Sequence, residues 1–377
     1  MRLQLVAPLF ELVEQDQAGA VAGVGGAQSL DLGEKSLESV FGQAAAFGQP
    51  LPAVIVPAFA PGRVQGIGPV AGAVAEQQLG QAWIAEFERA RTQLGRWGGA
   101  DLDAQALVAL ADEKGRILER VQEATPPDLE SGLKALDRMI ASVAHGRAVA
   151  GMGAAIGGPL DWKNGIVSPL HQPQWRGVPL KAIMEAKWKC PFFVDVDTNV
   201  AALGEYHFGE ERASRLLYLT LSTGMGGGFL VDGRIYRGLN GGHPEVGHQS
   251  INFRCSHPER VTCECGAPDC LEALVSGNAI RRIYGKPAER LAREEWQEVA
   301  YNLGQGLRNL SAVYLPDVIV LGGGVAVGGG EQLIACSAMV IKERLHIVPA
   351  PVIRLSRLGY DTALMGAVAV AMRGLET

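Results

Sequence analysis

Alternating apolar and polar positions predict strands in the chain after residue 105. Residues 106–121 contain two apolar runs around a polar turn at 113–115, which predicts a β-hairpin. Further apolar runs predict strands at residues 148–156, 192–197, 216–221, 228–231, 234–236 and 318–321.

Segments in which apolar residues recur at helical spacing lie between these strands. In residues 128–143 apolar side chains recur every three or four positions, which predicts an amphipathic helix. Other helices are predicted at residues 180–187, 199–208, 271–283, 295–314 and 362–373. Because strands and helices alternate and the strand interiors are apolar, the pattern indicates an α/β fold.

Residues 1–98 have a different character. They contain one lysine, Lys35, and are rich in Ala, Gly and Pro with little periodicity, so only residues 74–94 favour a helix. This segment holds six Lys and Arg against nine Asp and Glu, and no basic recognition helix, so we expect no DNA-binding domain. Two interpretations stay open: an appended accessory segment, or a poorly structured extension or even a misplaced start or reading frame.

Length, charge and apolar content narrow the class of protein. A chain of 377 residues can form two domains, each with its own core. The formal net charge of -6 argues against nucleic acid or an anionic membrane as the main partner. No apolar run approaches the roughly 20 residues of a membrane helix, and the first ten residues lack the features of a signal peptide. We therefore expect a cytoplasmic protein.

Three of the six cysteines lie close together in the sequence, at Cys263, Cys265 and Cys270. Disulfides between such close neighbours would be strained, so the spacing favours a metal site in a reducing compartment.

Asp197 is the strongest catalytic candidate because it ends one predicted strand and opens the next predicted helix. Such a carboxylate can accept a proton from a substrate hydroxyl, or it can simply cap the helix. The glycine-rich stretch of residues 221–229 could present backbone NH groups to phosphate, and residues 322–324, which have no side chains, could let a nucleotide pack on the backbone. Each stretch alone could equally be an ordinary turn.

Four motifs taken together resemble the ROK family of sugar kinases and sugar-responsive repressors. They are D-V-D-T-N-V-A-A-L-G-E (195–205), L-S-T-G-M-G-G-G-F (221–229), G-G-H-P-E-V-G-H (241–248) and C-E-C-G-A-P-D-C-L-E (263–272). The resemblance extends from about residue 99 onward. It implies the actin-like ATPase (ribonuclease H-like) fold, with a first lobe of residues 99–196 and 363–377 and a second lobe of residues 197–362 around a central cleft.

The resemblance also implies the roles of individual residues. Asp197 would be the general base, and the residues implied to bind the sugar are Gly158, Asn164, Glu245, His248 and Glu272. The ligands implied for a closed structural Zn²⁺ site are His248, Cys263, Cys265 and Cys270. The long interval between His248 and Cys263 contains Cys255 and His257, and either could take the place of His248.

A nucleotide site is implied in two parts of the chain. Thr223 with Gly224, and Gly322 with Gly323, would hold ATP together with Mg²⁺. The family's first phosphate motif should stand directly before Leu107, where the chain has G-G-A-D-L-D-A-Q-A-L (98–107). This stretch keeps an aspartate but lacks the glycine pair, the threonine and the lysine of the motif.

The expected activity is ATP-dependent phosphorylation of a hexose, at its 6-hydroxyl. Glucose is the first expected substrate, followed closely by fructose and mannose. The identity of the sugar stays open, because Val196 stands where most ROK glucokinases have asparagine and the motifs D-V-D-T-N and H-P-E look closer to the fructokinase branch. The competing hypothesis is a sugar-binding regulator without turnover. We expect a homodimer or homotetramer whose partners are a hexose and ATP, with no nucleic acid and no membrane.

Overall fold

Two groups of five strands each form the framework of the protein. The computed structural model describes the backbone of residues 53–58 and residues 105–126, 128–210 and 212–375, all within one unit, Pro50–Thr377. The predicted helix at 74–94 and residues 98–104 of the degenerate phosphate motif lie outside the described residues.

What we call the first sheet comprises an antiparallel meander and a parallel pair of strands that lies against it. The meander has the order β1-β2-β3, β1 contacts β4, and β4 pairs with β8 in parallel. Its strands are β1 (Ala53–Ala58), β2 (Gln105–Ala111), β3 (Ile117–Ala124), β4 (Met152–Ile156) and β8 (Phe192–Val196). β1 falls within the segment 1–98.

The second sheet is continuous and has the order β11-β10-β9-β12-β13. The first three strands are antiparallel, and β12 is parallel to both β9 and β13. Its strands are β9 (Arg215–Leu221), β10 (Met225–Val231), β11 (Arg234–Ile235), β12 (Val318–Gly322) and β13 (Val352–Leu355).

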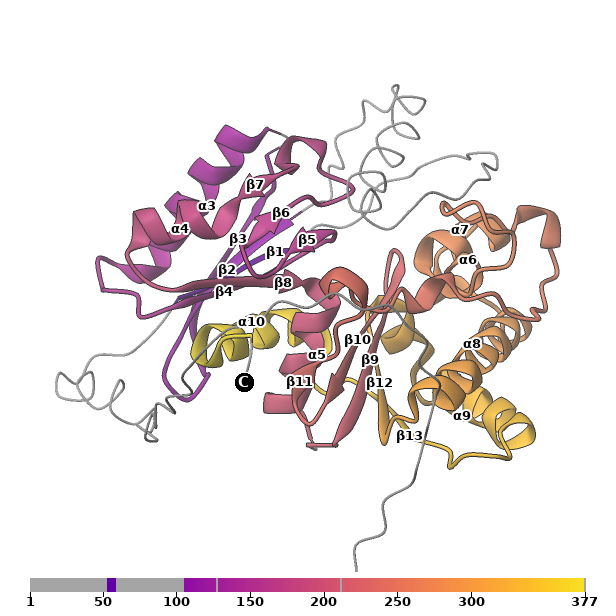
Figure 1. Ribbon diagram of the computed structural model, residues 1–377. Coiled ribbons are helices and arrows are strands. Elements are labelled where there is room, and N and C mark those ends of the chain that lie inside the picture. Colours follow the sequence, from indigo (N-terminus) through magenta and orange to yellow (C-terminus); the bar gives the residue numbers. More distant parts are fainter. Residues whose placement is uncertain (1–52, 59–104, 127, 211, 376–377) are drawn as a thin grey trace, which may run out of the picture. The chain divides into compact units, whose positions relative to one another are not determined.

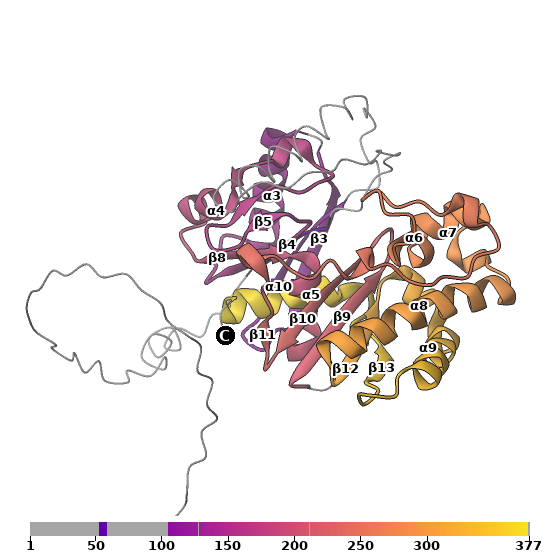
Figure 2. The same ribbon diagram turned by 45° about the vertical axis from the view of Figure 1, so that its right-hand side comes forward.

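Eight helices cover these sheets in the described part of the chain (Figures 1 and 2). Those packed on the first sheet are α3 (Leu129–Ala144) and α4 (Leu180–Trp188). Those packed on the second are α6 (Glu272–Val275), α7 (Gly277–Tyr284), α8 (Arg293–Tyr314) and α9 (Gly324–Arg344). The remaining two, α5 (Asp197–Phe208) and α10 (Thr362–Arg373), contribute to a core that both sheets share.

The alternation of side chains along each strand explains this shared core. In β2, Val108 packs towards α3, whereas Ala109 packs with α5 and α10. In β9, Leu217 packs towards α8, whereas Leu216 joins the same core as Ala109. Both sheets are therefore apolar on two faces, and one face of each is covered by the pair α5 and α10.

Glycines allow α5 and α10 to cross closely. A Cβ atom at Gly204 would lie 2.5 Å from the backbone oxygen of Thr362, and one at Gly366 would overlap the backbone oxygen of Val200. Only residues without a side chain fit at this crossing.

Most predicted elements are confirmed, including the β2–β3 hairpin and helix α10. The predicted helix at 271–283 is instead two helices, because Ser276 leaves the helical conformation and caps α7 by accepting a hydrogen bond from the Ala279 NH (3.2 Å). Sequence patterns missed α9, β13 and the small sheet β5 (Leu160–Asp161), β6 (Ile166–Val167) and β7 (Val178–Pro179).

Helix α9 is the one helix among the described residues that is long and apolar enough to cross a membrane by length and composition. A break at Gly330 (φ 56°, ψ −151°) interrupts it, and Leu333, Val340 and Ile341 are buried in the core. Core helices of soluble proteins pass the same test, so this observation is weak evidence for a membrane.

Candidate functional site

Asp197 occupies the junction between β8 and α5. Its Oδ1 accepts a hydrogen bond from the Thr198 backbone NH (2.8 Å), and the residue is partly buried. Loss of hydration raises the pKa of the Asp197 carboxyl group; the Thr198 NH and the nearby His243 act in the opposite direction, and Glu245 adds to the rise. A carboxylate with a raised pKa is a better proton acceptor than an exposed one.

The turn that carries Asp197 is held in place by the buried carboxylate of Asp195. Asp195 Oδ1 accepts from the Val196 NH (2.6 Å) and from the side-chain amide of Asn199 (3.0 Å). These bonds join the last residues of β8 to the first turn of α5, so they restrict where Asp197 can point.

His243 is a residue of this site that sequence reasoning did not select. Its Nε2 lies 3.5 Å from Glu245 Oε1, and a Cβ atom at Gly158 would lie 3.6 Å from His243 Cε1 and 3.5 Å from Val196 Cγ2. Three predicted site residues, Gly158, Glu245 and Asp197, thus gather around one imidazole. The H-P-E sequence was the available signal, and only its glutamate was selected.

Glu272 lies against the predicted phosphate turn. Its Oε2 accepts a hydrogen bond from the Met225 NH (3.0 Å), and a Cβ atom at Gly224 would lie 3.4 Å from the same oxygen. A residue predicted to bind sugar therefore contacts the segment predicted to bind ATP.

The turn at Thr223 and Gly224 rests on the start of α7. The Gly277 NH donates to the Ser222 carbonyl (2.7 Å), and the Asn278 NH donates to the Thr223 carbonyl (3.0 Å). Both turn residues remain partly exposed, although their carbonyl groups already accept hydrogen bonds from Asn278 and Ser222.

The three glycines of β10 have a packing role of their own. A Cβ atom at Gly226 would lie 2.9 Å from Thr198 Cγ2, one at Gly227 would lie 2.7 Å from Val246 Cγ2, and one at Gly228 would overlap the Thr198 backbone. These glycines bring β10 directly against the residue that follows Asp197.

Gly322 and Gly323 are likewise required by the fold. A Cβ atom at Gly322 would overlap the Tyr218 hydroxyl, and one at Gly323 would overlap the Leu221 carbonyl. Gly323 also has a φ of +86°, which disfavours other residues. Packing explains both glycines without a nucleotide, so they do not by themselves identify an ATP site.

Asn164 lies on the exposed turn between β5 and β6, where its amide donates to Asp161 Oδ2 (2.7 Å). The neighbouring Trp162 stacks on the Arg237 guanidinium, 3.8 Å from the ring centroid. The turn is thereby linked to the segment that leads into His243.

Four predicted metal ligands lie together in the described part of the chain. The ligand atoms of His248, Cys263, Cys265 and Cys270 are all within 4.8 Å of one another, and this group includes neither Cys255 nor His257. Burial raises the pKa of the Cys263 thiol to about 11, so a cation is needed to hold it as thiolate at neutral pH. This donor set suits Zn²⁺.

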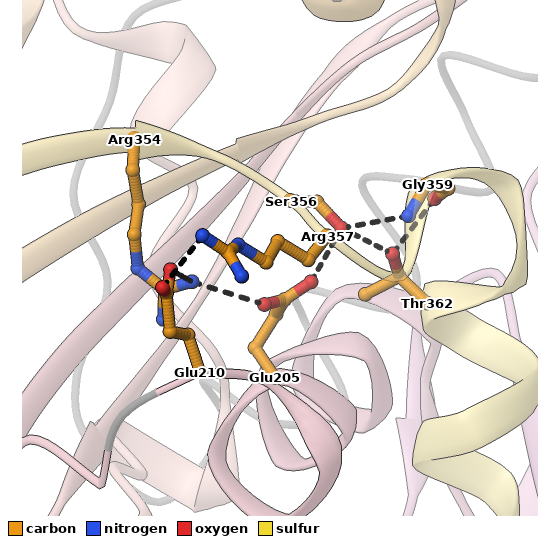
Figure 3. Close-up of polar contacts among 7 residues, drawn as sticks. All are labelled: Glu205, Glu210, Arg354, Ser356, Arg357, Gly359 and Thr362. Carbon is orange, nitrogen blue, oxygen red and sulfur yellow. Dashed lines mark hydrogen bonds and ion pairs between the residues drawn. The ribbon is translucent and has the colours of Figure 1, made fainter.

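A second buried polar cluster surrounds the far end of α5 (Figure 3). The fully buried Glu205 accepts a hydrogen bond from Ser356 Oγ, which lies 2.8 Å from Thr362 Oγ1. Glu205 Oε2 lies 4.0 Å from Arg354 Nη1. Burial raises the pKa of Glu205, against the opposing effects of Ser356 and Arg354.

Comparison with known proteins identifies the family. Residues 98–373 match the ROK family. The chain belongs to the ROK family. Among its relatives, it is 31% identical to a fructokinase of Zymomonas mobilis over 71% of this chain and 92% of that protein. It is 27% identical to a xylose repressor of Caldicellulosiruptor bescii over 60% of this chain, and spans 63% of the length of that repressor.

Solved structures of ROK proteins share its architecture. The crystal structure of a ROK hexokinase from Thermus thermophilus matches with a TM-score of 0.62 and 32% identity, covering 71% of this chain and 94% of that one. A ROK glucokinase from Streptomyces griseus in complex with glucose and AMPPNP matches with a TM-score of 0.59 and 28% identity, covering 72% and 96%. This ROK protein thus has the expected actin-like ATPase fold of α/β class.

Proposed function

We propose that this ROK protein transfers a phosphoryl group from ATP to the 6-hydroxyl of a hexose, with Asp197 as general base. The observation that supports this most directly is the contact between Thr198, next to Asp197, and Gly226 and Gly228 of β10. β10 begins at the turn proposed to hold phosphate, so the proton acceptor and the phosphate donor would be neighbours.

The sugar would be held around Asp197 by Gly158, Asn164, Glu245, His248 and Glu272. His243, which lies between Gly158 and Glu245, joins this proposal. Glucose remains the first candidate because the S. griseus glucokinase was solved with it. Fructose and mannose follow, since the Z. mobilis relative is a fructokinase.

ATP would be held by Thr223 and Gly224 on one side and by Gly322 and Gly323 on the other. The AMPPNP bound to the S. griseus glucokinase supports a nucleotide site in this fold. Mg²⁺ bound with the nucleotide would neutralise charge on the transferred group. Asp197 would accept the hydroxyl proton, and closure of the proposed lobes, residues 99–196 with 363–377 and residues 197–362, would exclude water.

His248, Cys263, Cys265 and Cys270 would hold a structural Zn²⁺ that joins two loops. The Leu271 NH donates to the Gln249 carbonyl (3.0 Å), so these loops already lie side by side. Elemental analysis of the purified protein should give one zinc per chain. The variant Cys265→Ser should contain less zinc, and no other metal should take its place. Reduced thiols and an acidic chain also support a cytoplasmic protein.

A regulator that binds sugar without turnover is the second candidate. The xylose repressor relative supports it, as do residues 98–107, where the phosphate motif is degenerate. In this case sugar binding would be independent of ATP.

Incubation with Mg-ATP and a panel of hexoses, with ADP release as the measurement, separates the two candidates. A kinase releases ADP with at least one hexose and loses this activity in Asp197→Asn while retaining sugar binding. Sugar binding without ADP release from any hexose selects the regulator. Sedimentation analysis of the same preparation tests the proposed homodimer or homotetramer.

A further inference from the structure

Arg237 makes a largely buried ion pair with Asp195, two residues before the candidate base Asp197. Its guanidinium contacts the Asp195 carboxylate, and the exposed fractions of the two side chains are 15% and 1%. The other oxygen of Asp195, Oδ1, accepts a hydrogen bond from the side-chain amide of Asn199. Asn199 and Asp197 both belong to the first turn of α5. The ion pair therefore connects the segment following β11 to the turn that carries Asp197.

The same guanidinium also reaches a third segment. It stacks on the Trp162 ring at 3.8 Å, in the turn between β5 and β6 that carries Asn164. A Cβ atom at Gly241 would lie 2.8 Å from Trp162 Nε1, so this ring also fits against the backbone that leads to His243. One side chain thus joins three segments that are distant in the sequence.

An arginine is suited to this position because its planar group can stack and donate hydrogen bonds at once. Removing two charges from water is costly, and a buried ion pair adds little net stability compared with apolar side chains. Stability alone is therefore a weak reason for this pair. A role in fixing the relative positions of the three segments accounts for it better.

We propose that Arg237 is a positioning residue that aligns the sugar-binding groups on these three segments. The proposal rests on the proposed sugar site, because Asp197, Asn164 and Glu245 are the groups that would be aligned. It assigns no contact between Arg237 and the sugar or ATP. Loss of the alignment should weaken sugar binding and leave ATP binding intact.

The test compares Arg237→Met with Arg254→Met in the full chain. Arg254 stacks on Tyr301 at the same distance, 3.8 Å, and belongs to no proposed site, so it controls for loss of a stacked arginine. Hexose affinity by calorimetry, KM for hexose and for ATP, and Tm are measured for each variant. We expect Arg237→Met to weaken hexose affinity and raise the hexose KM by about 10- to 100-fold, with KM for ATP unchanged.

A lysine at the same position sharpens the interpretation. Arg237→Lys keeps the charge facing Asp195 but loses the planar stack, so it should recover part of the hexose affinity. If Arg237→Met does not fold, Trp162→Leu and Trp162→Phe replace it. The leucine variant removes the stack and should weaken hexose binding by a smaller factor, and the phenylalanine variant should restore most of it.

Hexose affinity in Arg237→Met equal to that in Arg254→Met overturns the positioning role, and so does an equal rise in both KM values. Failure of the proposed kinase activity has a different signature, namely no ADP release by the unmodified protein. Calorimetry still tests Arg237 in that case because a regulator also binds sugar. A protein that neither binds nor phosphorylates any hexose contradicts both proposals.

Discussion

The two ends of helix α5 carry two acidic residues in contrasting surroundings. Burial raises the pKa of both, Asp197 at the first position and Glu205 two turns later. Among the described residues, Asp197 accepts one hydrogen bond, from the backbone NH of Thr198. It is partly exposed. Glu205 is fully buried and bonded to Ser356 beside α10.

A raised pKa alone therefore does not distinguish a catalytic carboxylate from a structural one. The distinction lies in the partners: Asp197 is partly exposed and accepts a hydrogen bond from the backbone NH of its neighbour, whereas Glu205 is fully buried beside Arg354, Ser356 and Thr362 (Figure 3). The N-terminal end of α5, with Asp197, is suited to proton transfer. The C-terminal end, with Glu205, holds α5 against neighbouring segments.

Asp197→Asn should have the largest effect of any single change on turnover. The amide cannot accept the sugar proton, so kcat should fall by about 10²- to 10⁴-fold while Tm changes little. Steady-state kinetics and thermal unfolding measure the two quantities. Asp128→Asn is the matched control, because Asp128 caps α3 by accepting from the Ser131 NH (2.8 Å) far from the site in sequence. Val196, not Asp197, is the N-cap of α5 and no side chain caps it, so unchanged kcat in Asp197→Asn would leave Asp197 without a catalytic role.

Glu205→Ala should have the largest effect on stability. It removes a fully buried side chain, leaves a cavity and takes the acceptor from the Ser356 hydroxyl, while Arg354 keeps Glu210 at 3.8 Å, so the free energy of unfolding should fall by about 2–5 kcal/mol. Urea unfolding measures this loss. Glu130→Ala, which breaks an exposed pair with Lys134, should change stability by less than about 0.5 kcal/mol. Equal losses in the two variants would contradict the structural role of Glu205.

The pH dependence should separate the two carboxylates by its sign. Asp197 must be ionised to act as a base, so kcat should rise as pH increases through its raised pKa. Glu205 holds its proton more tightly in the folded than in the unfolded state. Its contribution to stability is thus present below the ordinary glutamate pKa and is lost as pH rises through the raised value.

Steady-state kinetics and urea unfolding between about pH 4 and 8 would measure the pH dependence of kcat and of stability. This range begins near the ordinary pKa of a carboxyl group and extends above it. Glu205→Gln should flatten the stability profile and leave the activity profile in place. A shift of the activity profile in Glu205→Gln would mean that the two ends of α5 do not act independently.

Ser356→Ala should have the smallest effect. Its hydroxyl donates to Glu205 and accepts from the Gly359 NH (3.0 Å), so its loss should lower the free energy of unfolding by about 1–3 kcal/mol. Urea unfolding of Ser214→Ala provides the comparison, since Ser214 makes an exposed bond to Asp232. A lower kcat in Ser356→Ala under conditions where the variant is fully folded would link this cluster to catalysis.

Local sequence patterns predicted most of the fold and part of the site. Asp197 could be predicted because a strand followed at once by a helix is visible in neighbouring residues. The clustering of three candidate metal ligands could be predicted because the thiols of Cys263, Cys265 and Cys270 lie within eight residues, C-x-C-x4-C, whereas His248 was indicated only by the family resemblance. Helix α9 was missed because its glycines weaken the helical pattern and packing on α8 compensates.

Contacts between distant segments could not be predicted. The pairing of Arg237 with Asp195, the position of His243 beside Gly158 and the burial of Glu205 against Ser356 each require the folded arrangement. The glycines of β10 show the same limit, because their sequence suggested a phosphate loop and their packing against Thr198 and Val246 appears only in three dimensions.

The central place of α10 has a consequence for how the chain is made. A ribosome synthesises both sheets before it reaches Thr362–Arg373, yet this helix packs against β4 and β1 of the first sheet and against α5. Until it emerges, the nascent protein exposes apolar surface on that sheet and on α5, the kind of surface that chaperones bind. A premature stop codon before α10 would therefore yield an aggregation-prone product rather than a shorter folded protein.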